Sequence, residues 1–238
     1  MKIKKLFLSV LSLVFVFPLV YLLVIGFSKV SFDKLFVEAS NSILLAVFSV
    51  LLSLLLAIPS AYVYVYQLFK VKTLFGIFIF ILAIIPPFIL SILFVNLGYF
   101  FNIDNGLGML IVSHSIVIFP YSFIFVIIGF NYVPKQMHKG SFIYCSSFFK
   151  RFYFFYFPYM KNALFVAFLF GISISLSQYV LTLMLSTPGF STLILEMVPY
   201  LHSADIKRAN TYGLVVIFFS FFTLFIVYNF FRKNRVLS

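Results

Sequence analysis

Side chains that could carry acid–base or metal chemistry are scarce in this sequence. The chain has five Asp and Glu residues, three His and one Cys among 238 residues. Of these groups, His114 in Ser113-His114-Ser115 is the one that falls within a long apolar run. A lone histidine in such a run more often packs through hydrogen bonds than carries protons, and the single Cys145 cannot form an internal disulfide or a CxxC site. We therefore expect no metal site and no catalytic residues.

Sequence motifs for nucleotide binding and hydrolysis are also absent. The chain contains no G-x-x-x-x-G-K-[ST] phosphate loop, no G-x-S-x-G and no H-E-x-x-H. We therefore predict that it is not an enzyme and does not hydrolyse ATP by itself. If the chain transports a solute against a gradient, a partner must supply the energy.

The elements that would position any site are predicted to be membrane-spanning helices. Hydrophobic residues make up 64% of the chain and charged residues 9%, which is far from the balance of a soluble domain. Because a span needs about 20 apolar residues, the sequence predicts an all-α integral membrane protein of about six transmembrane helices in one domain, residues 1–238. The predicted spans are residues 6–28, 40–66, 74–98, 106–130, 162–185 and 209–231.

Proline and glycine mark the expected irregularities in these spans. Pro86-Pro87 lies in the middle of the third span, where the missing backbone donors should bend the helix and favour a cavity. Thr187-Pro188-Gly189 is a strong turn signal and should end the fifth span near Leu185. Residues 190–201 are then expected to form a loop or a shallow re-entrant piece.

The distribution of charge predicts the orientation in the membrane. With both termini cytoplasmic, the outer segments hold only Lys29, Lys34, Lys207 and Arg208 of the 17 lysines and arginines. This bias follows the positive-inside rule, so we predict a multi-pass membrane protein with cytoplasmic termini. The net charge of +12 therefore indicates orientation and not nucleic-acid binding.

The most unusual stretch is residues 134–158, which we call the aromatic-basic segment. It mixes the cations of Lys135, Lys139, Lys150 and Arg151 with many aromatic residues, so it cannot be a membrane span. The pattern predicts a cytoplasmic helix-turn-helix, with two short amphipathic helices joined near residues 145–147 at the membrane surface. Its aromatic face would meet lipid or a partner protein, and an interfacial helix without a partner is the simpler alternative.

The aromatic-basic segment resembles the coupling loop of permease subunits of binding-protein-dependent ABC importers. That loop reads Glu-Ala-Ala, three residues, Gly, and a Phe before a terminal Leu-Pro. Anchored on Pro158, the resemblance places Lys139-Gly140-Ser141 at Glu-Ala-Ala and Cys145 at the Gly. It implies that ATPase contacts come from Lys139, Gly140, Ser141, Cys145, Ser146, Phe152, Phe155 and Pro158. Lys139 reverses the charge of the family's Glu, and because Cys145 replaces a glycine we predict a negative φ there.

Other patches extend the resemblance along the chain. Residues 41–46 with 57–62, and residues 106–111 with His114 and 119–121, are similar to the family's membrane core. Residues 175–179 followed by 190–193 are similar to its thiamine, ferric-iron and polyamine branch. The neutral amide of Gln178, where relatives often carry Asp, argues against a strongly cationic or metal substrate. The proposed pathway residues are Pro86, Pro87, Ser175, Ser177, Gln178 and Tyr179, for which helix packing is an equal alternative.

The resemblance also implies a location in a bacterial inner membrane, and it implies partners. Two ATPase subunits would bind the aromatic-basic segments and hold the ATP and Mg, while the chain itself needs no cofactor. A second copy or a paralogue would complete the pathway, and a periplasmic or lipid-anchored binding protein would deliver a small solute such as thiamine, iron, a polyamine or an oxyanion. Two other classes remain open from the residues alone, namely an ATPase-independent carrier or channel and a membrane enzyme or assembly factor.

Overall fold

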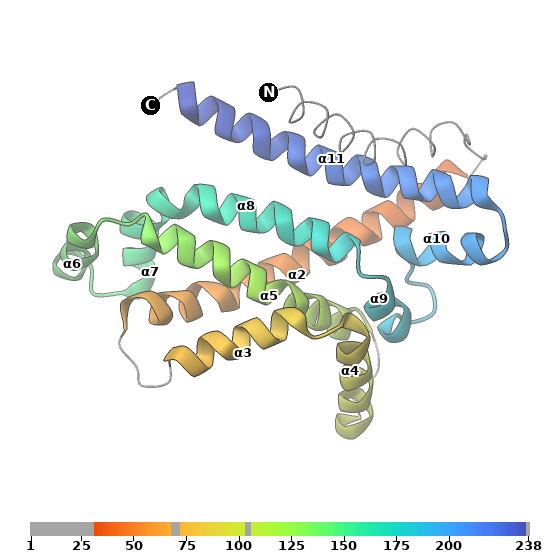
Figure 1. Ribbon diagram of the computed structural model, residues 1–238, viewed down its shortest axis with the longest axis horizontal. Coiled ribbons are helices and arrows are strands. Elements are labelled where there is room, and N and C mark those ends of the chain that lie inside the picture. The colour runs from red at the N-terminus through yellow and green to blue at the C-terminus, as the bar shows by residue number, and fades with distance from the viewer. Residues whose placement is uncertain (1–30, 68–71, 103–105, 237–238) are drawn as a thin grey trace, which may run out of the picture.

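The fold was analysed in a computed structural model, which describes residues 31–67, 72–102 and 106–236 (Figure 1). These residues form helices joined by short turns, with no strand among them. The predicted first span, residues 6–28, lies outside the described residues. In chain order the helices are α2 (Phe32–Tyr66), α3 (Lys72–Ile84), α4 (Pro87–Phe101), α5 (Leu107–Asn131), α6 (Lys135–Tyr144), α7 (Phe148–Arg151), the π-helical η1 (Phe152–Tyr156), α8 (Phe157–Leu176), α9 (Tyr179–Leu185), α10 (Leu193–His202) and α11 (Ile206–Val236).

The all-helical class is confirmed, and the apolar helices are compatible with a multi-pass membrane protein. Within the described residues, three helices are long and apolar enough to cross a membrane: Phe32–Tyr66, Leu107–Asn131 and Phe148–Leu176. The number becomes four if the bent pair α3 and α4 counts as one span. The six-span arrangement stays a prediction.

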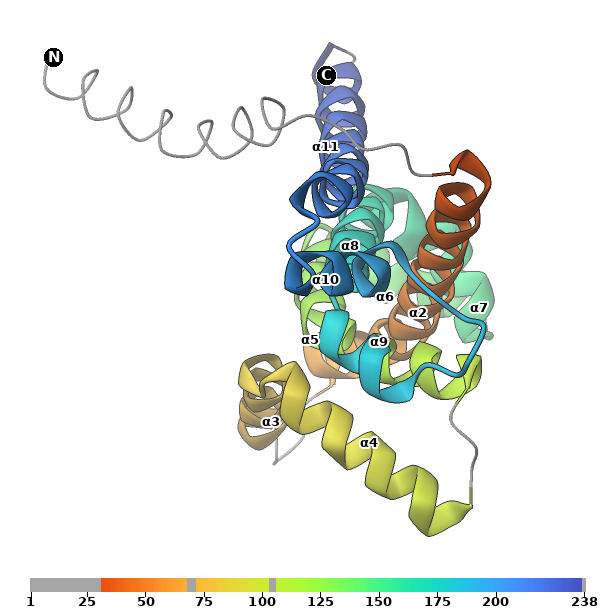
Figure 2. The ribbon, with the colours of Figure 1, turned by 90° about the vertical axis from the view of Figure 1, so that its right-hand side faces the viewer.

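The centre of the fold is formed by α2, α5 and α8, which lie side by side (Figures 1 and 2). Small residues bring the three helices together. Gly171 of α8 lies so close to α2 and α5 that an added Cβ would come within 2.8 Å of Val50 and 3.0 Å of Ile118. Ser53 of α2 donates a hydrogen bond of 2.9 Å to Ser122 of α5, both buried. Such close contacts of small and hydroxyl residues are typical of helices that pack within membranes.

The bend at Pro86-Pro87 is far sharper than a kink. The axes of α3 and α4 differ by 100°, so residues 74–98 form a broken span or a re-entrant loop and not one straight helix. Neither proline has an N–H to give to the preceding turn, and Pro87 instead occupies the first turn of α4, where proline is tolerated. In Figure 2, α4 extends away from the bundle.

The predicted fifth span, residues 162–185, differs from the structure at both ends. The helix begins at Phe148, well inside the aromatic-basic segment, and it ends at Leu176. At this end the hydroxyl of Ser177 donates a hydrogen bond of 2.7 Å to the carbonyl of Ile174, which competes with a further helical turn. The chain then starts the short α9, and the predicted turn follows it, with Gly189 at a φ of 92°.

The segment after that turn also differs from the prediction. Residues 190–201 were expected to be a loop or a shallow re-entrant piece. The loop is wrong, because Leu193–His202 forms the helix α10, capped by the side chain of Thr192, and the re-entrant position stays a prediction. Lys34 of α2 binds Glu196 of α10 with 2.7 Å between Nζ and Oε2. The turn signal at residues 187–189 suggested a loop, whereas this contact with a residue 162 positions away helps to hold the helix in place. The predicted sixth span, 209–231, lies within α11.

Candidate functional site

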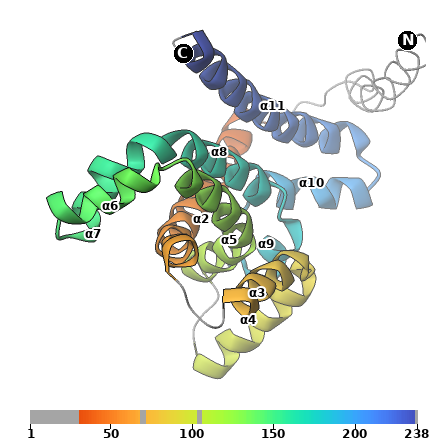
Figure 3. The same ribbon diagram turned by 60° about the vertical axis from the view of Figure 1, so that its left-hand side comes forward.

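One candidate site is the aromatic-basic segment, which lies at the end of the bundle where α2 and α5 finish (Figures 1 and 3). Its first half is the helix α6, as predicted, and the turn at residues 145–147 is also present. The second half is not a separate short helix, because α7, η1 and α8 run on as one helix from Phe148 to Leu176. The predicted pair of two short helices is therefore not found. Instead, α6 and the turn are followed by one long helix, and the η1 part of that helix contacts α6.

The irregular stretch η1 explains why the helix continues through Pro158. Proline cannot donate to the carbonyl four residues earlier, that of Phe154, and an ordinary helix would kink or end there. The backbone widens to a π-helix over Phe152–Tyr156, in which the N–H of Phe157 reaches the carbonyl of Phe152. Single π-helical turns of this kind insert an extra residue and redirect side chains. Here Tyr156 is fully buried while Tyr153 and Phe154 are exposed.

Aromatic stacking attaches α6 to the bundle. The imidazole of His138 lies against the ring of Tyr66 from α2, with centroids 3.8 Å apart and planes 5° from parallel. His138 Nδ1 is also hydrogen-bonded to the Tyr156 hydroxyl at 2.9 Å. Ser141 donates to the His138 carbonyl at 2.7 Å and lies 3.3 Å from the same hydroxyl. Burial, followed by the nearby charge of Arg151, lowers the pKa of His138 below its ordinary value, which favours a neutral ring here.

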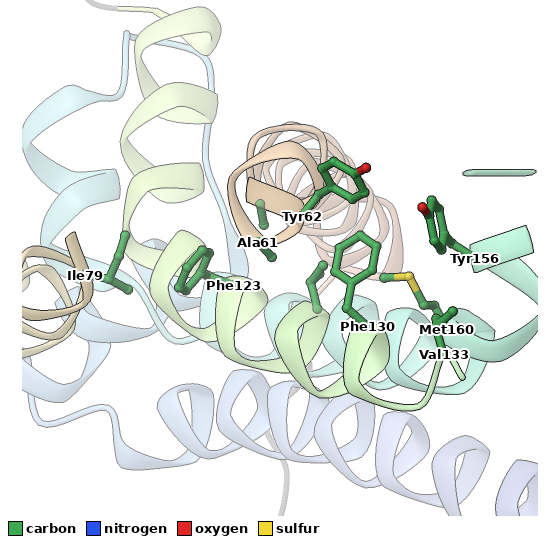
Figure 4. Packing of buried hydrophobic residues seen from close by; sticks show 10 residues of the cluster. Ala61, Tyr62, Ile79, Phe123, Phe130, Val133, Tyr156 and Met160 are labelled. Atoms are coloured by element: carbon green, nitrogen blue, oxygen red, sulfur yellow. The ribbon is translucent and has the colours of Figure 1, made fainter. Parts of the chain in front are cut away.

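A core of large side chains lies beneath this attachment. In Figure 4, Tyr62, Phe130 and Tyr156 converge from α2, α5 and η1. The ring of Tyr62 is 5.8 Å from that of Phe130 and 5.8 Å from that of Tyr156, within the range of favourable aromatic pairs. Met160 of α8 is fully buried in the same cluster. The segment is thus packed against the three central helices. A displacement of the segment would therefore move all three.

The outer face of the segment carries apolar side chains that remain largely exposed among the described residues. Ile143 is 83% exposed and Phe149 is 82% exposed. Arg151 lies over the ring of Phe142 at 4.3 Å and donates hydrogen bonds to two carbonyls of the turn, which fixes the turn's shape. We call the following residues the outer face: Phe142, Ile143, Tyr144, Phe149, Tyr153 and Phe154, all exposed and flanked by the exposed Lys135, Lys139 and Lys150.

None of the residues predicted to contact an ATPase is among the six of the outer face, although Lys139 flanks it. Ser141 is buried, and Phe152 packs against the core cluster. Phe155 stacks on Tyr144 with centroids 6.2 Å apart. The others are exposed, namely Lys139, Ser146 and Pro158, or half-buried, namely Gly140 and Cys145. The φ of Cys145 is −137°, which confirms the predicted negative value and leaves the turn without backbone strain.

The second candidate site is a cavity of about 320 Å³ at the two helix breaks. It brings together four of the six residues predicted to line a pathway, which are Pro86, Pro87, Ser177 and Gln178. Tyr179 begins α9 and does not line the cavity, and Ser175 is buried behind it. The walls come from α3, α4, α5 and the end of α8, and we call this space the break cavity.

His114 holds the second break in place. Its ring is fully buried, with Nδ1 2.9 Å from the Ser175 hydroxyl and Nε2 3.3 Å from the Thr182 hydroxyl. Ser175 lies in the last turn of α8 and Thr182 belongs to α9, so the ring connects the two pieces on either side of residues 177–178. This is the packing role that the sequence favoured. Within the described residues, no group of three or more His, Cys, Asp or Glu could hold a metal ion.

Sequence reasoning missed His138, Tyr66 and Tyr156 as the attachment of the segment. The spacing of the aromatic residues gave no indication of which ones turn inward, because the π-helical turn shifts the register by one residue. A possible signal was Pro158 itself, since a proline within a helical pattern marks a local irregularity.

Comparison with protein-family models and with characterised proteins gives no match for this chain.

Proposed function

We propose that this chain is the membrane permease subunit of an ATP-driven importer and that the outer face docks onto an ATPase partner. The observation that carries the proposal is the contrast between the two sides of the aromatic-basic segment. Its inner side is fixed to α2, α5 and α8 through Tyr66, His138 and Tyr156, whereas its outer face leaves large apolar side chains uncovered. On a surface outside the lipid, where we place this segment, large exposed apolar patches mark interaction sites.

The break cavity fits the same proposal. Broken helices near the middle of a membrane protein are where transporters place their solute sites. The chain would form half of a pathway, paired with a second copy or a paralogue, and a binding protein would deliver the solute on the far side. Six spans, cytoplasmic termini and an inner-membrane location are parts of this proposal. ATP and Mg would be held by the partner.

The proposal is tested by purification of the tagged chain from its native membrane and measurement of ATP hydrolysis. We expect a P-loop ATPase to copurify, with activity that depends on the chain. Ile143→Asp and Phe149→Asp should abolish this association, because each places a carboxylate in the outer face. The matched control is Leu201→Asp, which changes a half-exposed leucine of α10 at the other end of the bundle.

The alternative is a carrier or channel that needs no ATPase. In that case the purified chain alone would mediate solute flux in liposomes, and the two outer-face variants would behave like Leu201→Asp. Either result would contradict the importer proposal.

A further inference from the structure

The break cavity contains features that constrain the chemistry of its occupant. Its lining has no Asp, Glu, Lys, Arg or His, and the polar side chains among the described residues are Tyr121, Ser177 and Gln178. Its volume of about 320 Å³ lies at the lower end of the range of ligand pockets. The cavity is therefore suited to a small solute, and an ion bound there would have no charged side chain to balance it.

The α3 side of the cavity supplies hydrogen-bond acceptors. In a continuous helix the carbonyls of Leu82 and Ala83 would accept from positions 86 and 87, but both positions are prolines without an N–H. Leu82 and Ala83 both line the cavity. The carboxyl end of a helix also carries a partial negative charge of about half an elementary charge, which favours donors over anions.

The α8 side adds a further acceptor and one amide. Ser177 gives its hydroxyl proton to the carbonyl of Ile174 at 2.7 Å, so its oxygen can only accept from a ligand. The backbone of Gln178 accepts from Thr182 at 2.6 Å, but its side-chain amide makes no hydrogen bond to any described residue. The remaining lining is apolar, with Leu90, Val117 and Ile174 among it.

We propose that the break cavity binds a small uncharged organic solute, which donates hydrogen bonds from hydroxyl or amide groups and presents an apolar surface to the remaining walls. This inference rests on the proposed function in one respect, because it takes the cavity as part of the solute pathway. Anions lack a cation to pair with and face the negative end of α3. Divalent metal ions lack the carboxylates and imidazoles that they prefer. Dications lose their hydration without a carboxylate to replace it.

The test uses three five-carbon probes that differ only in their terminal groups. Pentane-1,5-diol is uncharged, cadaverine is a dication and glutarate is a dianion. Binding to the full chain in lipid nanodiscs is measured by saturation-transfer NMR on the probe. We expect a saturable signal for the diol. Its affinity should be at least about tenfold higher than that of either charged probe, because one hydrogen bond changes an affinity by about this factor.

Two substitutions at Gln178 keep the test specific to the cavity. Gln178→Leu should weaken diol binding by roughly tenfold, because the amide contact is lost. Gln178→Glu is nearly isosteric and should reverse the preference toward cadaverine. Gln136→Leu, on the exposed surface of α6, is the matched control and should bind the diol as the unmodified chain does.

The possible results separate this inference from the importer proposal. Stronger binding of cadaverine or glutarate by the unmodified chain would overturn the inference, as would diol binding that Gln178→Leu and Gln178→Glu leave unchanged. Diol binding needs no ATPase, so it can succeed where no ATPase copurifies, and in that case the importer proposal alone fails. If an ATPase associates and the diol does not bind, the inference alone fails.

Discussion

His138 and Tyr66 lie ring on ring, with 3.8 Å between centroids, although one residue belongs to α6 and the other to the end of α2. This stack joins the aromatic-basic segment to a helix that is long enough to cross the membrane. The contact also contains a titratable group, so the attachment should respond to pH.

The attachment of α6 should weaken in acid. Burial, and then the charge of Arg151, lower the pKa of His138 in the folded chain, whereas in the detached segment it returns to an ordinary value near ~6.5. The detached state then binds the proton more readily, so the stabilisation is complete above that ordinary pKa and decreases as the pH falls through it toward the lower folded value. We expect hydrogen exchange of residues 135–144, corrected for intrinsic rates, to be faster at pH 5.5 than at pH 7.5.

His138→Phe preserves an aromatic ring and removes the titration, so the exchange of the same residues should then lose this pH dependence. His202→Phe, at the exposed end of α10, should retain it. An equal pH dependence in the chain with and without His138 would contradict the assignment.

Gly171 should tolerate no side chain. An added Cβ would lie 2.8 Å from Val50 Cγ2 and 3.0 Å from Ile118 Cγ2, and both neighbours are β-branched residues with little rotational freedom. Gly171→Ala should therefore lower the free energy of unfolding by about 1–3 kcal/mol, seen as a lower Tm in detergent.

Gly108→Ala is the control for Gly171→Ala, because a Cβ at Gly108 meets nothing within 4 Å. It should raise stability slightly, since alanine is the better helix former by about 1 kcal/mol. Val50→Ala combined with Gly171→Ala should restore part of the lost stability. If the Gly171→Ala and Gly108→Ala variants have the same Tm, the close packing of α2, α5 and α8 at Gly171 is contradicted.

Lys34 should hold α10 against α2. Its Nζ lies 2.7 Å from Glu196 Oε2 and 3.6 Å from Glu38 Oε1. Half-exposed ion pairs of this kind contribute only about 1 kcal/mol, but Glu38 is 1% exposed and Lys34 is the cation beside it. Lys34→Met would leave this buried carboxylate without its cation, so proteolysis near residues 186–205 should become faster.

The double variant Lys34→Met with Glu38→Gln distinguishes charge from packing. Removal of the uncompensated carboxylate should restore much of the resistance to proteolysis. If the double variant is as sensitive as Lys34→Met, the loss comes from the contact with Glu196 instead.

Cys145 offers a direct test of orientation, because it is the only cysteine and is half-buried in the turn of the aromatic-basic segment. A membrane-impermeant maleimide should label it in inside-out vesicles and not in right-side-out vesicles. Cys145→Ser with Ser203→Cys should give the opposite pattern, since Ser203 follows α10 at the other end of the bundle. Labelling of Cys145 from the outside would refute the proposed topology.

Much of this architecture could be predicted from single residues whose effect is local. The break at Pro86-Pro87, the turn at Pro188-Gly189 and the end of α6 before Cys145 all follow from backbone chemistry within a few positions. Part of the predicted set of pathway residues does lie together in the fold, because Gln178 and Pro86 line one cavity.

The features that could not be predicted depend on distant contacts. The end of α8 at Leu176 is stabilised by His114, and α10 is held by Lys34, neither of which is near in sequence. Apolar periodicity does not distinguish a helix that ends at Leu176 from one that ends at Leu185, because both stretches are uncharged. The inward turn of Tyr156 needed the π-helical shift before Pro158.

The 100° bend between α3 and α4 limits how this molecule can move. Two adjacent prolines remove two consecutive backbone donors, and the ring of Pro87 disfavours a helical ψ at Pro86, which is extended with a ψ of 136°. The bend is therefore built into the backbone conformation at these two positions. Changes in the shape of the break cavity are therefore expected from α3 and α4 tilting together, or from movement at Ser177 and Gln178, where the chain carries no proline.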